Sequence, residues 1–356
     1  MADQGQLPLA TSFPVCGVPH AVDDCVLLAH GEGARLTRKL IHDVLAPAFD
    51  NELLRPLADA AILPAIEGRF ALTTDSYVVS PLFFPGGDIG KLAVHGTVND
   101  LAVSGAEPLY LTLSLILEEG LPIGTLRRVV QSIRAAAEAC GTPVVTGDTK
   151  VVPRGAVDGL FINTTGVGRL RKHAELGAGR VKPGDRVLVS GTLGDHGIAI
   201  LAARAELAFE GELQSDTAPL HELVQSLFAA NLRPRFLRDP TRGGVAAVLH
   251  ELADAAGVSI VVEEQAVPVS PAVRGACELL GLDPLFVANE GKLVAVVAPE
   301  EADAALACLR RHSLGRSAEV IGAVTVDAPA TVLVRGPLGH LRILDEPSGA
   351  PLPRIC

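Results

Sequence analysis

Strand patterns and helix patterns alternate along the whole chain, and this interleaving limits the possible folds more than any other feature. β-Branched residues at alternating positions mark a strand at 70–79, and a helical pattern follows at 88–104. The second half repeats this style after a break rich in Gly, Lys and Arg at 169–184. A chain of 356 residues is long enough for two domains. The pattern therefore predicts two α+β domains.

The same patterns predict the individual elements. Strands are expected at 25–29, 70–79, 109–118, 143–146, 160–167, 186–190, 258–263, 285–288, 292–298, 319–325, 331–335 and 341–345. Helices are expected at 35–49, 88–104, 123–140, 196–209, 218–230, 242–256, 271–280 and 300–312. No predicted strand leads into a G-x-G-x-x-G helix start, and no G-x-x-x-x-G-K-[ST] occurs. The two commonest nucleotide-binding folds are therefore disfavoured.

The charge of the chain narrows the class of partner. A net charge of −11 argues against general nucleic-acid binding, which normally needs a basic patch. It does not exclude a nucleotide, because metal ions can bridge carboxylates to phosphates. No apolar run approaches the roughly 18 residues of a membrane span, and no signal peptide is evident. We expect a cytoplasmic protein that binds neither nucleic acid nor a membrane.

Three carboxylates fall within a short stretch of the first half. Asp75 lies on the strand at 70–79, Asp88 opens the following helix, and Asp100 lies near the end of that helix. Carboxylate oxygens are the ligands that Mg²⁺ prefers. The simpler alternative is that Asp88 only caps the helix. That alternative accounts for one of the three, so the stretch indicates a metal and phosphate site.

The same helix carries groups that can bind phosphate. Lys91, His95 and Asn99 are spaced i, i+4 and i+8, so they share one stripe of the helix. Gly86 and Gly87 precede the helix and permit close approach of the backbone to a ligand. Helix N-termini attract phosphate, which fits this arrangement.

A second polar stretch, Thr146-Gly-Asp-Thr-Lys150, follows the strand at 143–146 and runs on to Arg154. Lys150 and Arg154 are cations that could bind phosphate. Glu290, before the apolar strand at 292–298, could serve as a general base. A solvated loop is the plain alternative for 146–155.

The last residue of the chain is a cysteine, Cys356. Prolines at 347, 351 and 353 keep the preceding segment extended. Arg354 would favour the reactive thiolate form of the thiol. A frayed and silent terminus is the ordinary alternative. The other possibility is a flexible arm that carries a nucleophile into a site built by the rest of the chain.

These stretches, in this order, resemble the HypE family of hydrogenase maturation proteins, within the superfamily of aminoimidazole ribonucleotide synthetase and selenophosphate synthetase. The matching sequences are TTDSYVVSPLFFPGGDIGKLAVHGTVNDLAVSGAEP (73–108), VVTGDTKVVPRG (144–155), LVSGTLGDHG (188–197), RDPTRGGV (238–245), ANEGKL (288–293) and PRIC (353–356). One departure is visible, because the family's glycine-rich start resembles H-G-x-G-G and Ala34 stands here in place of its last glycine.

The resemblance implies an ATP-dependent carbamoyl dehydratase. A HypF-like carbamoyltransferase would load a carbamoyl group onto Cys356, and ATP would phosphorylate the carbamoyl oxygen. Loss of phosphate and protons would leave a thiocyanate on the sulfur. A HypC-HypD-like scaffold complex would accept the cyanide as an iron ligand for [NiFe]-hydrogenase. Two alternatives remain: a small-molecule kinase or synthetase with an incidental tail, and a carrier without enzymatic activity.

The resemblance also implies the architecture and the roles of the residues. Residues 1–26 are an unassigned lead-in, 27–170 an ATP-binding domain that forms a β-barrel in a homodimer, 171–345 a second α+β domain, and 346–356 the flexible tail. The expected catalytic residues are Cys356, Glu290, Lys150 and His95. The expected ATP and phosphate ligands are Lys91, Asn99, Gly87, Gly147, Thr149 and Arg154, and the expected Mg²⁺ ligands are Asp75, Asp88, Asp100 and Asp148.

Overall fold

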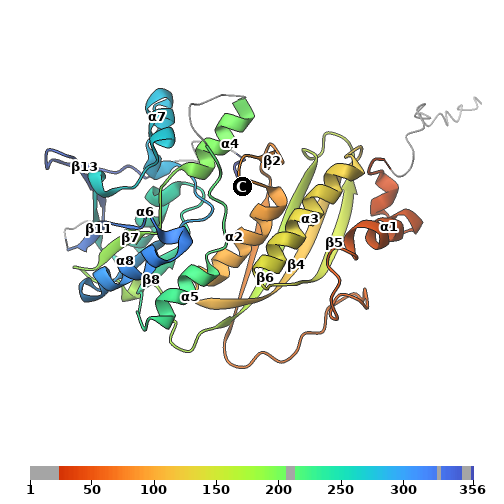
Figure 1. Ribbon diagram of the computed structural model, residues 1–356, viewed down its shortest axis with the longest axis horizontal. Helices are drawn as coiled ribbons and strands as arrows, with labels where there is room; N and C mark the ends of the chain where they lie inside the picture. Colours follow the sequence, from red (N-terminus) through yellow and green to blue (C-terminus); the bar gives the residue numbers. More distant parts are fainter. Residues whose placement is uncertain (1–23, 206–212, 327–329, 347–353) are drawn as a thin grey trace, which may run out of the picture.

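The computed structural model describes residues 24–205, 213–326, 330–346 and 354–356. It builds one large sheet in each half of the chain and, in the first half, a small two-stranded sheet as well (Figure 1). The helices are α1 (Arg35–Leu40), which continues as a π-helical turn (Ile41–Leu45), α2 (Ile89–Val103), α3 (Ile123–Ala139), α4 (Asp195–Ala205), α5 (His221–Ala229), α6 (Gly244–Ala256), α7 (Pro271–Leu280) and α8 (Ala302–Arg311). The strands are β1 (Phe70–Tyr77), β2 (Phe83–Phe84), β3 (Gly87–Asp88), β4 (Ala106–Glu118), β5 (Val144–Val152), β6 (Leu160–Leu170), β7 (Arg186–Val189), β8 (Phe236–Arg238), β9 (Ser259–Glu263), β10 (Val294–Val297), β11 (Glu319–Thr325), β12 (Val332–Arg335) and β13 (Leu341–Ile343).

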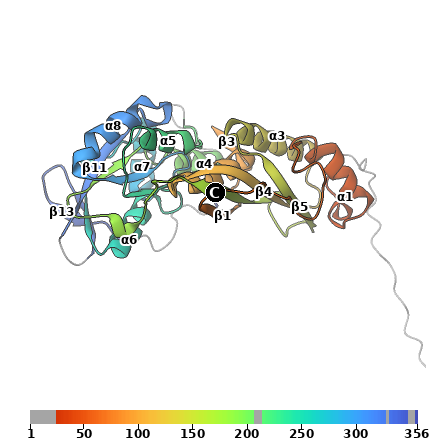
Figure 2. The same cartoon turned by 90° about the horizontal axis from the view of Figure 1, so that it is seen from below.

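The N-terminal sheet has the strand order β1-β6-β4-β5, with β4 and β5 parallel and the other pairs antiparallel. Alternate leucines of β4, from Leu111 to Leu117, are buried on one face, as the period of a strand requires. Helix α2 packs across β1, β4 and β6 on that face, with α3 beside it (Figures 1 and 2). No helix of the described residues covers the other face, which leaves Phe70, Leu72 and Ile116 exposed.

The C-terminal sheet has the order β13-β12-β9-β11-β7-β10-β8 and is covered on both faces. Strand β10, Val-Ala-Val-Val, is buried throughout, which explains its unbroken apolar sequence. Val294 and Val296 pack with α6, whereas Ala295 and Val297 pack with α5 and α8. This two-sided core holds the segment before β10 rigidly in place, and that segment carries Glu290.

Most of the predicted elements are confirmed, but two strands are wrong. Instead of a strand at 25–29, Cys25 forms an isolated bridge with Pro122, and a 3-10 helix follows at Leu28–Gly31. The expected strand at 285–288 is largely a 3-10 turn, Pro284–Phe286, because Pro284 fixes the backbone and the Asp283 side chain accepts from the Leu285 amide.

Strand β5, the open sheets and the ends of the chain also bear on the expectations from the sequence. Strand β5 continues to Val152, so the stretch expected as a loop after the strand forms most of the strand itself. Within the described residues neither sheet closes into a barrel, and no helix is both long and apolar enough to cross a membrane. Most of the lead-in, and the three tail prolines, lie outside the described residues.

Candidate active site at the chain terminus

The last three residues of the chain lie in the middle of the molecule, between α2 and α4 (Figure 1). The Cys356 carbonyl oxygen accepts from the Val78 amide at 3.1 Å, and the Arg354 carbonyl accepts from the Ser80 amide at 3.3 Å. This is the spacing of an added antiparallel strand. The Ile355 side chain, 3% exposed, joins the core of the N-terminal domain. The terminus is therefore docked by both its backbone and its apolar side chain.

The segment that ends in Cys356 is also held from the side of α4. His196 Nε2 lies 2.6 Å from the Ile355 carbonyl oxygen, and Arg204 donates to the Arg354 carbonyl at 2.7 Å. The Arg354 guanidinium turns outward, forms an ion pair with Asp158 at 3.0 Å and does not face the thiol.

The docked thiol has a weakened tendency to ionise. Burial raises the pKa of Cys356 far above its usual value, and the Glu290 carboxylate raises it further, against an opposing effect of Arg242. The expectation that Arg354 would favour the thiolate is therefore wrong for this position of the tail. The pocket suits a sulfur that already carries a neutral group rather than a free thiolate.

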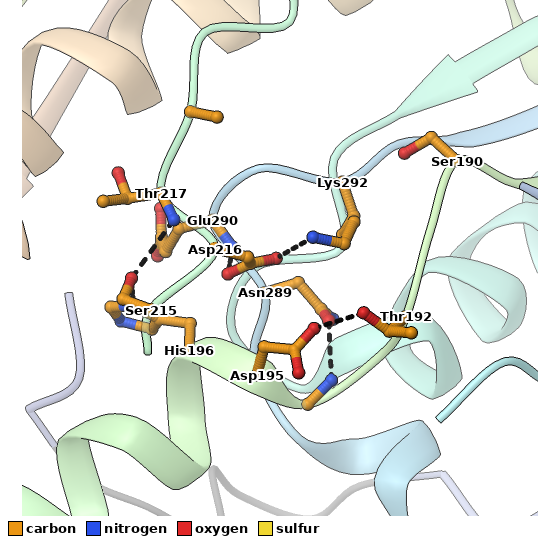
Figure 3. Close-up of polar contacts among 12 residues, drawn as sticks. Ser190, Thr192, Asp195, His196, Ser215, Asp216, Thr217, Asn289, Glu290 and Lys292 are labelled. Atoms are coloured by element: carbon orange, nitrogen blue, oxygen red, sulfur yellow. Dashed lines mark hydrogen bonds and ion pairs between the residues drawn. The ribbon is translucent and has the colours of Figure 1, made fainter. Parts of the chain in front are cut away.

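Glu290, which lies beside Asp216 (Figure 3), is a buried carboxylate whose charge acts on this thiol. It is 2% exposed, and its Oε1 has no hydrogen-bond partner among the residues that the structure describes. Burial raises the pKa of Glu290 well above its usual range, and the charges of Asp239 and Asp216 raise it further. Its backbone N–H donates a hydrogen bond to Asp216 Oδ1 at 3.1 Å. A buried carboxylate of raised pKa with one oxygen open among the described residues is suited to accept a proton.

Three aspartates gather near Glu290. Asp75 on β1 and Asp100 on α2 are joined by Asp239, which follows β8. Burial, with the charge of Asp100 next, raises the pKa of Asp239 to about 7, and burial also raises the pKa of Asp100. No three acidic, histidine or cysteine side chains of the described ranges stand close enough to form a metal group as they are. Their mutual repulsion nevertheless favours a cation among them.

The other two expected metal ligands lie elsewhere. Asp88 caps α2, because its Oδ1 accepts from the Gly90 and Lys91 amides at 2.8 and 3.1 Å. Its Oδ2 accepts from Ser132 at 2.6 Å, so the helix-cap alternative describes its contacts. Asp148 lies on β5, at the opposite edge of the sheet from β1, and pairs with Lys150 at 3.1 Å. One chain therefore does not form the four-carboxylate site that the sequence predicts.

Lys91, His95 and Asn99 form one stripe along α2, and the last two contact the second domain. Lys91 Nζ donates to the Gly86 carbonyl at 3.1 Å, next to the expected phosphate-binding turn. Burial, and then Lys91, lowers the pKa of His95 to about 3, so its ring is neutral and contacts Thr217 Oγ1 at 3.2 Å.

Asn99 is engaged within the protein. Its Nδ2 donates to the carbonyls of Ala218 and Glu290 at 3.0 and 3.1 Å, and its Oδ1 accepts from Leu220 at 2.7 Å. In this conformation Asn99 holds the segment that carries Glu290, and its amide group is engaged within the protein rather than open to a nucleotide.

The remaining expected ATP ligands are spread over both edges of the N-terminal domain. Gly87 packs against Thr217 and Phe84, where a Cβ would meet the Thr217 methyl at 2.8 Å. Gly147 and Thr149 of β5 line a cavity of about 400 Å³ beneath α1. Arg154 lies against Gly120 beyond the end of β5. The structure therefore does not bring Gly87 together with the β5 residues inside one chain.

Four buried polar residues near Glu290 were not singled out by the sequence. They are Asp239, His196, Asp216 and Lys292, and the last two form an ion pair at 3.0 Å with side chains 4% and 12% exposed (Figure 3). Asp239 and His196 lay in glycine-rich motifs that are usually turns. The signal that could have found them is the density of charged groups beside those glycines.

Comparisons with known proteins agree with this architecture. The family model described as AIR synthase related protein, N-terminal domain, matches residues 57–170, and the corresponding C-terminal domain model matches residues 182–335. The two halves thus define an AIR synthase related protein.

Individual relatives narrow the class. The chain is 52% identical over 330 residues to the carbamoyl dehydratase HypE of Cupriavidus necator, over 92% of this chain and 94% of that protein. A crystal structure of the hydrogenase maturation protein HypE in complex with ATP matches with a TM-score of 0.89 and 47% identity, over 93% and 99% of the two chains. A HypE-HypF complex matches with a TM-score of 0.76 and 49% identity, over 86% and 99%. The chain belongs to the HypE family.

Proposed function

We propose that this chain is a carbamoyl dehydratase of hydrogenase maturation that works on its own C-terminal residue. It converts an S-carbamoyl group on Cys356 into a thiocyanate at the expense of ATP. The observation that carries the proposal is the docking of the chain terminus where the charge of Glu290 acts on the Cys356 thiol. Glu290 is a buried carboxylate whose Oε1 has no hydrogen-bond partner among the described residues. The identity to proteins named carbamoyl dehydratase supports it independently.

The reaction needs ATP because an amide oxygen is a poor leaving group. The carbamoyl oxygen attacks the γ-phosphorus, and ADP leaves. The carbamoyl nitrogen then loses its protons, and the C–O bond breaks to release phosphate. The product is S–C≡N, with the elements of water ending in phosphate. Glu290 accepts a proton from the nitrogen, and the buried pocket keeps out water that would hydrolyse the activated group.

ATP and Mg²⁺ fit the acidic end of the site. Asp75, Asp100 and Asp239 would hold Mg²⁺, since they are hard oxygen donors whose charges oppose one another. The ion would supply charge neutralisation for the phosphates. Lys91, next to the Gly86 carbonyl, is placed to meet a phosphate group. A similar HypE was crystallised with ATP, which supports a nucleotide here.

The open face of the N-terminal sheet supports a homodimer in which two such sheets form a barrel. Phe70, Leu72 and Ile116 expose apolar surface there, and an uncovered apolar sheet face needs a partner. Asp148 pairs in register with Ser114, and Lys150 with Ile116, so both lie on this open face. Lys150 and Asp148 would then serve the active site of the partner chain rather than their own.

We expect carbamoylation of Cys356 and dehydration of the carbamoyl group to take place at different positions of the tail. Because burial keeps Cys356 protonated in the pocket, carbamoylation takes place with the tail outside, on a HypF-like carbamoyltransferase. A similar HypE forms a complex with HypF, which supports this partner. A HypC-HypD-like scaffold would accept the cyanide, and the setting would be cytoplasmic.

We further propose that the chain folds as two domains, residues 27–170 and residues 171–345, with the ATP site in the first.

Mass spectrometry of the C-terminal peptide tests the function. Protein carbamoylated at Cys356 and then given ATP and Mg²⁺ should lose the mass of one water from that peptide. Cys356→Ala should show neither the carbamoylated peptide nor the peptide that has lost water, whereas Cys25→Ala should behave like the wild type. If the loaded peptide never loses water, the dehydratase proposal fails. If removal of residues 347–356 leaves turnover of a small-molecule substrate intact, the kinase alternative holds instead.

A further inference from the structure

We propose that His196 is the positioning residue for the tail: it holds the Ile355 carbonyl and thereby sets Cys356 against Glu290. This deepens the proposed function and rests on it. The ring of His196 is fully buried, with Nε2 at 2.6 Å from Ile355 O and Nδ1 at 2.7 Å from Ser215 Oγ.

The hydrogen-bond partners fix the tautomer of the ring. A carbonyl oxygen can only accept, so Nε2 carries the hydrogen and donates it to Ile355. Nδ1 then accepts from the Ser215 hydroxyl, whose oxygen also accepts from the Thr217 amide at 3.1 Å. Phe84 meets the ring edge to face, with centroids 5.7 Å apart. Both nitrogens and one edge of the ring are engaged, so the direction of the Nε2–H bond is fixed.

The backbone carbonyls of the tail are held one by one. The Val78 amide binds the Cys356 carbonyl, and the Ser80 amide and Arg204 bind the Arg354 carbonyl. His196 holds the carbonyl between them, that of Ile355. The Ile355 side chain contributes hydrophobic burial, which has no direction. The Arg354 side chain binds at the exposed surface, where an ion pair contributes little. His196 acts on the carbonyl that is joined directly to the nitrogen of Cys356, in a site from which water is excluded. Together with the Val78 amide on the Cys356 carbonyl, a donor at that point sets the rotation of the last residue and hence the path of its sulfur.

The contact also links the tail to the rest of the site. Ser215, Asp216 and Thr217 are consecutive, and each contacts a different part: Ser215 the His196 ring, Asp216 the amide of Glu290, and Thr217 the ring of His95 on α2. His196 is thus held by the same short segment that holds the base. Residues 215–217 therefore hold both the tail, through His196, and Glu290, and a reaction between two groups requires that they be held in a fixed relative position.

The test separates positioning from folding. His196→Leu removes the donor, and His196→Gln keeps an N–H that can reach the same carbonyl. His250 provides a matched control, because its Nε2 contacts the Leu344 carbonyl at 2.9 Å in the C-terminal domain. The first readout is the rate at which iodoacetamide alkylates Cys356, followed on the C-terminal peptide. The second is the single-turnover rate of thiocyanate formation from carbamoylated protein with saturating ATP.

For His196→Leu we expect alkylation of Cys356 to accelerate and thiocyanate formation to slow, each by about tenfold (about 1.4 kcal/mol). His196→Gln should recover most of both rates, and His250→Leu should change neither, with ATP binding retained in all three. Unchanged alkylation in His196→Leu overturns the proposal, as does failure of Gln to rescue in a protein with wild-type thermal stability. If wild-type protein never forms thiocyanate, the proposed function fails, while the alkylation rates still decide whether His196 seats the tail.

Discussion

At the scale of single residues, the proposed chemistry depends on Glu290, whose Oε1 has no hydrogen-bond partner among the described residues. Glu290→Gln keeps the size of the side chain but cannot accept a proton. We expect thiocyanate formation to fall by roughly 10²- to 10⁴-fold, the usual contribution of a general base. ATP binding should persist, because the backbone contacts of Glu290 remain. If Glu290→Gln dehydrates at the wild-type rate, Glu290 is not the base, and Lys150 becomes the next candidate. Glu251→Gln, at an exposed position on α6, is the control.

The pH dependence of the rate follows from the same residue. Burial raises the pKa of Glu290, and a base works only in its ionised form. The single-turnover rate should therefore rise with pH through the pKa of Glu290 in the complex with ATP and Mg²⁺. Measurement of the rate across the neutral range in wild type and in Glu290→Gln checks this. A pH profile that is the same in both proteins would assign the titration to another group.

The sequence predicted some of these residues better than others, for a physical reason. Glu290 and Cys356 are recognisable locally, one before an apolar strand and the other at the chain end. His196 acquires its partner only when Ile355, 159 positions away, docks beside it. Asp239 likewise meets Asp100 only across the two domains. Contacts of this kind leave no local pattern, so the glycines around them read as ordinary turns.

At the scale of elements, α2 shows what local sequence can predict, and β5 shows what depends on a neighbouring strand. The helix was predicted because its start and its polar stripe are local features. Strand β5 extends further than expected because β4, lying parallel to it, continues the ladder from Thr112 to Glu118. That extension turns an expected loop into an edge strand and moves Asp148 and Lys150 to the open face of the sheet.

The cap of α2 provides a test at this scale. Asp88→Ala removes the acceptor for two helix amides and for Ser132, and should lower the free energy of unfolding by about 1–2 kcal/mol. Denaturant unfolding measures the change. Ser270→Ala, which removes the longer 3.4 Å cap of α7, should cost less. If instead Asp88→Asn keeps full stability but loses Mg²⁺-dependent ATP binding, Asp88 is a metal ligand as first expected.

At the scale of the whole molecule, the acidic cluster opposes folding when it is ionised. The pKa of Asp239 is raised from 3.8 to about 7, so the folded chain keeps a proton there that the unfolded chain has lost. The stability that this group contributes is complete only below its unfolded pKa of 3.8 and is lost as pH rises from there through about 7. Without Mg²⁺, the midpoint of thermal unfolding should fall between pH 5 and pH 8. Asp239→Asn should reduce that fall, whereas exposed Asp254→Asn should not. An equal fall in Asp239→Asn would show that Asp239 is ionised throughout.

The proposed dimer determines whether one chain is a complete catalyst. Leu72, 65% exposed on the open sheet face, should lie inside the interface, so Leu72→Glu should reduce the particle from two chains to one in light scattering. Leu341→Glu, at a 51% exposed position on β13, should leave the dimer intact. A wild-type particle of one chain would rule out the barrel.

The position of Lys150 on the open face then makes a sharper prediction. Lys150→Ala and Cys356→Ala should each be inactive alone, because one lacks the cation and the other the carrier. Unfolded and refolded together, they form mixed dimers in which an intact tail meets an intact Lys150 from the other chain. Thiocyanate should then appear on the Lys150→Ala chain only. If the mixture stays inactive although mixed dimers form, Lys150 acts within its own chain, against the register that turns it toward the open face.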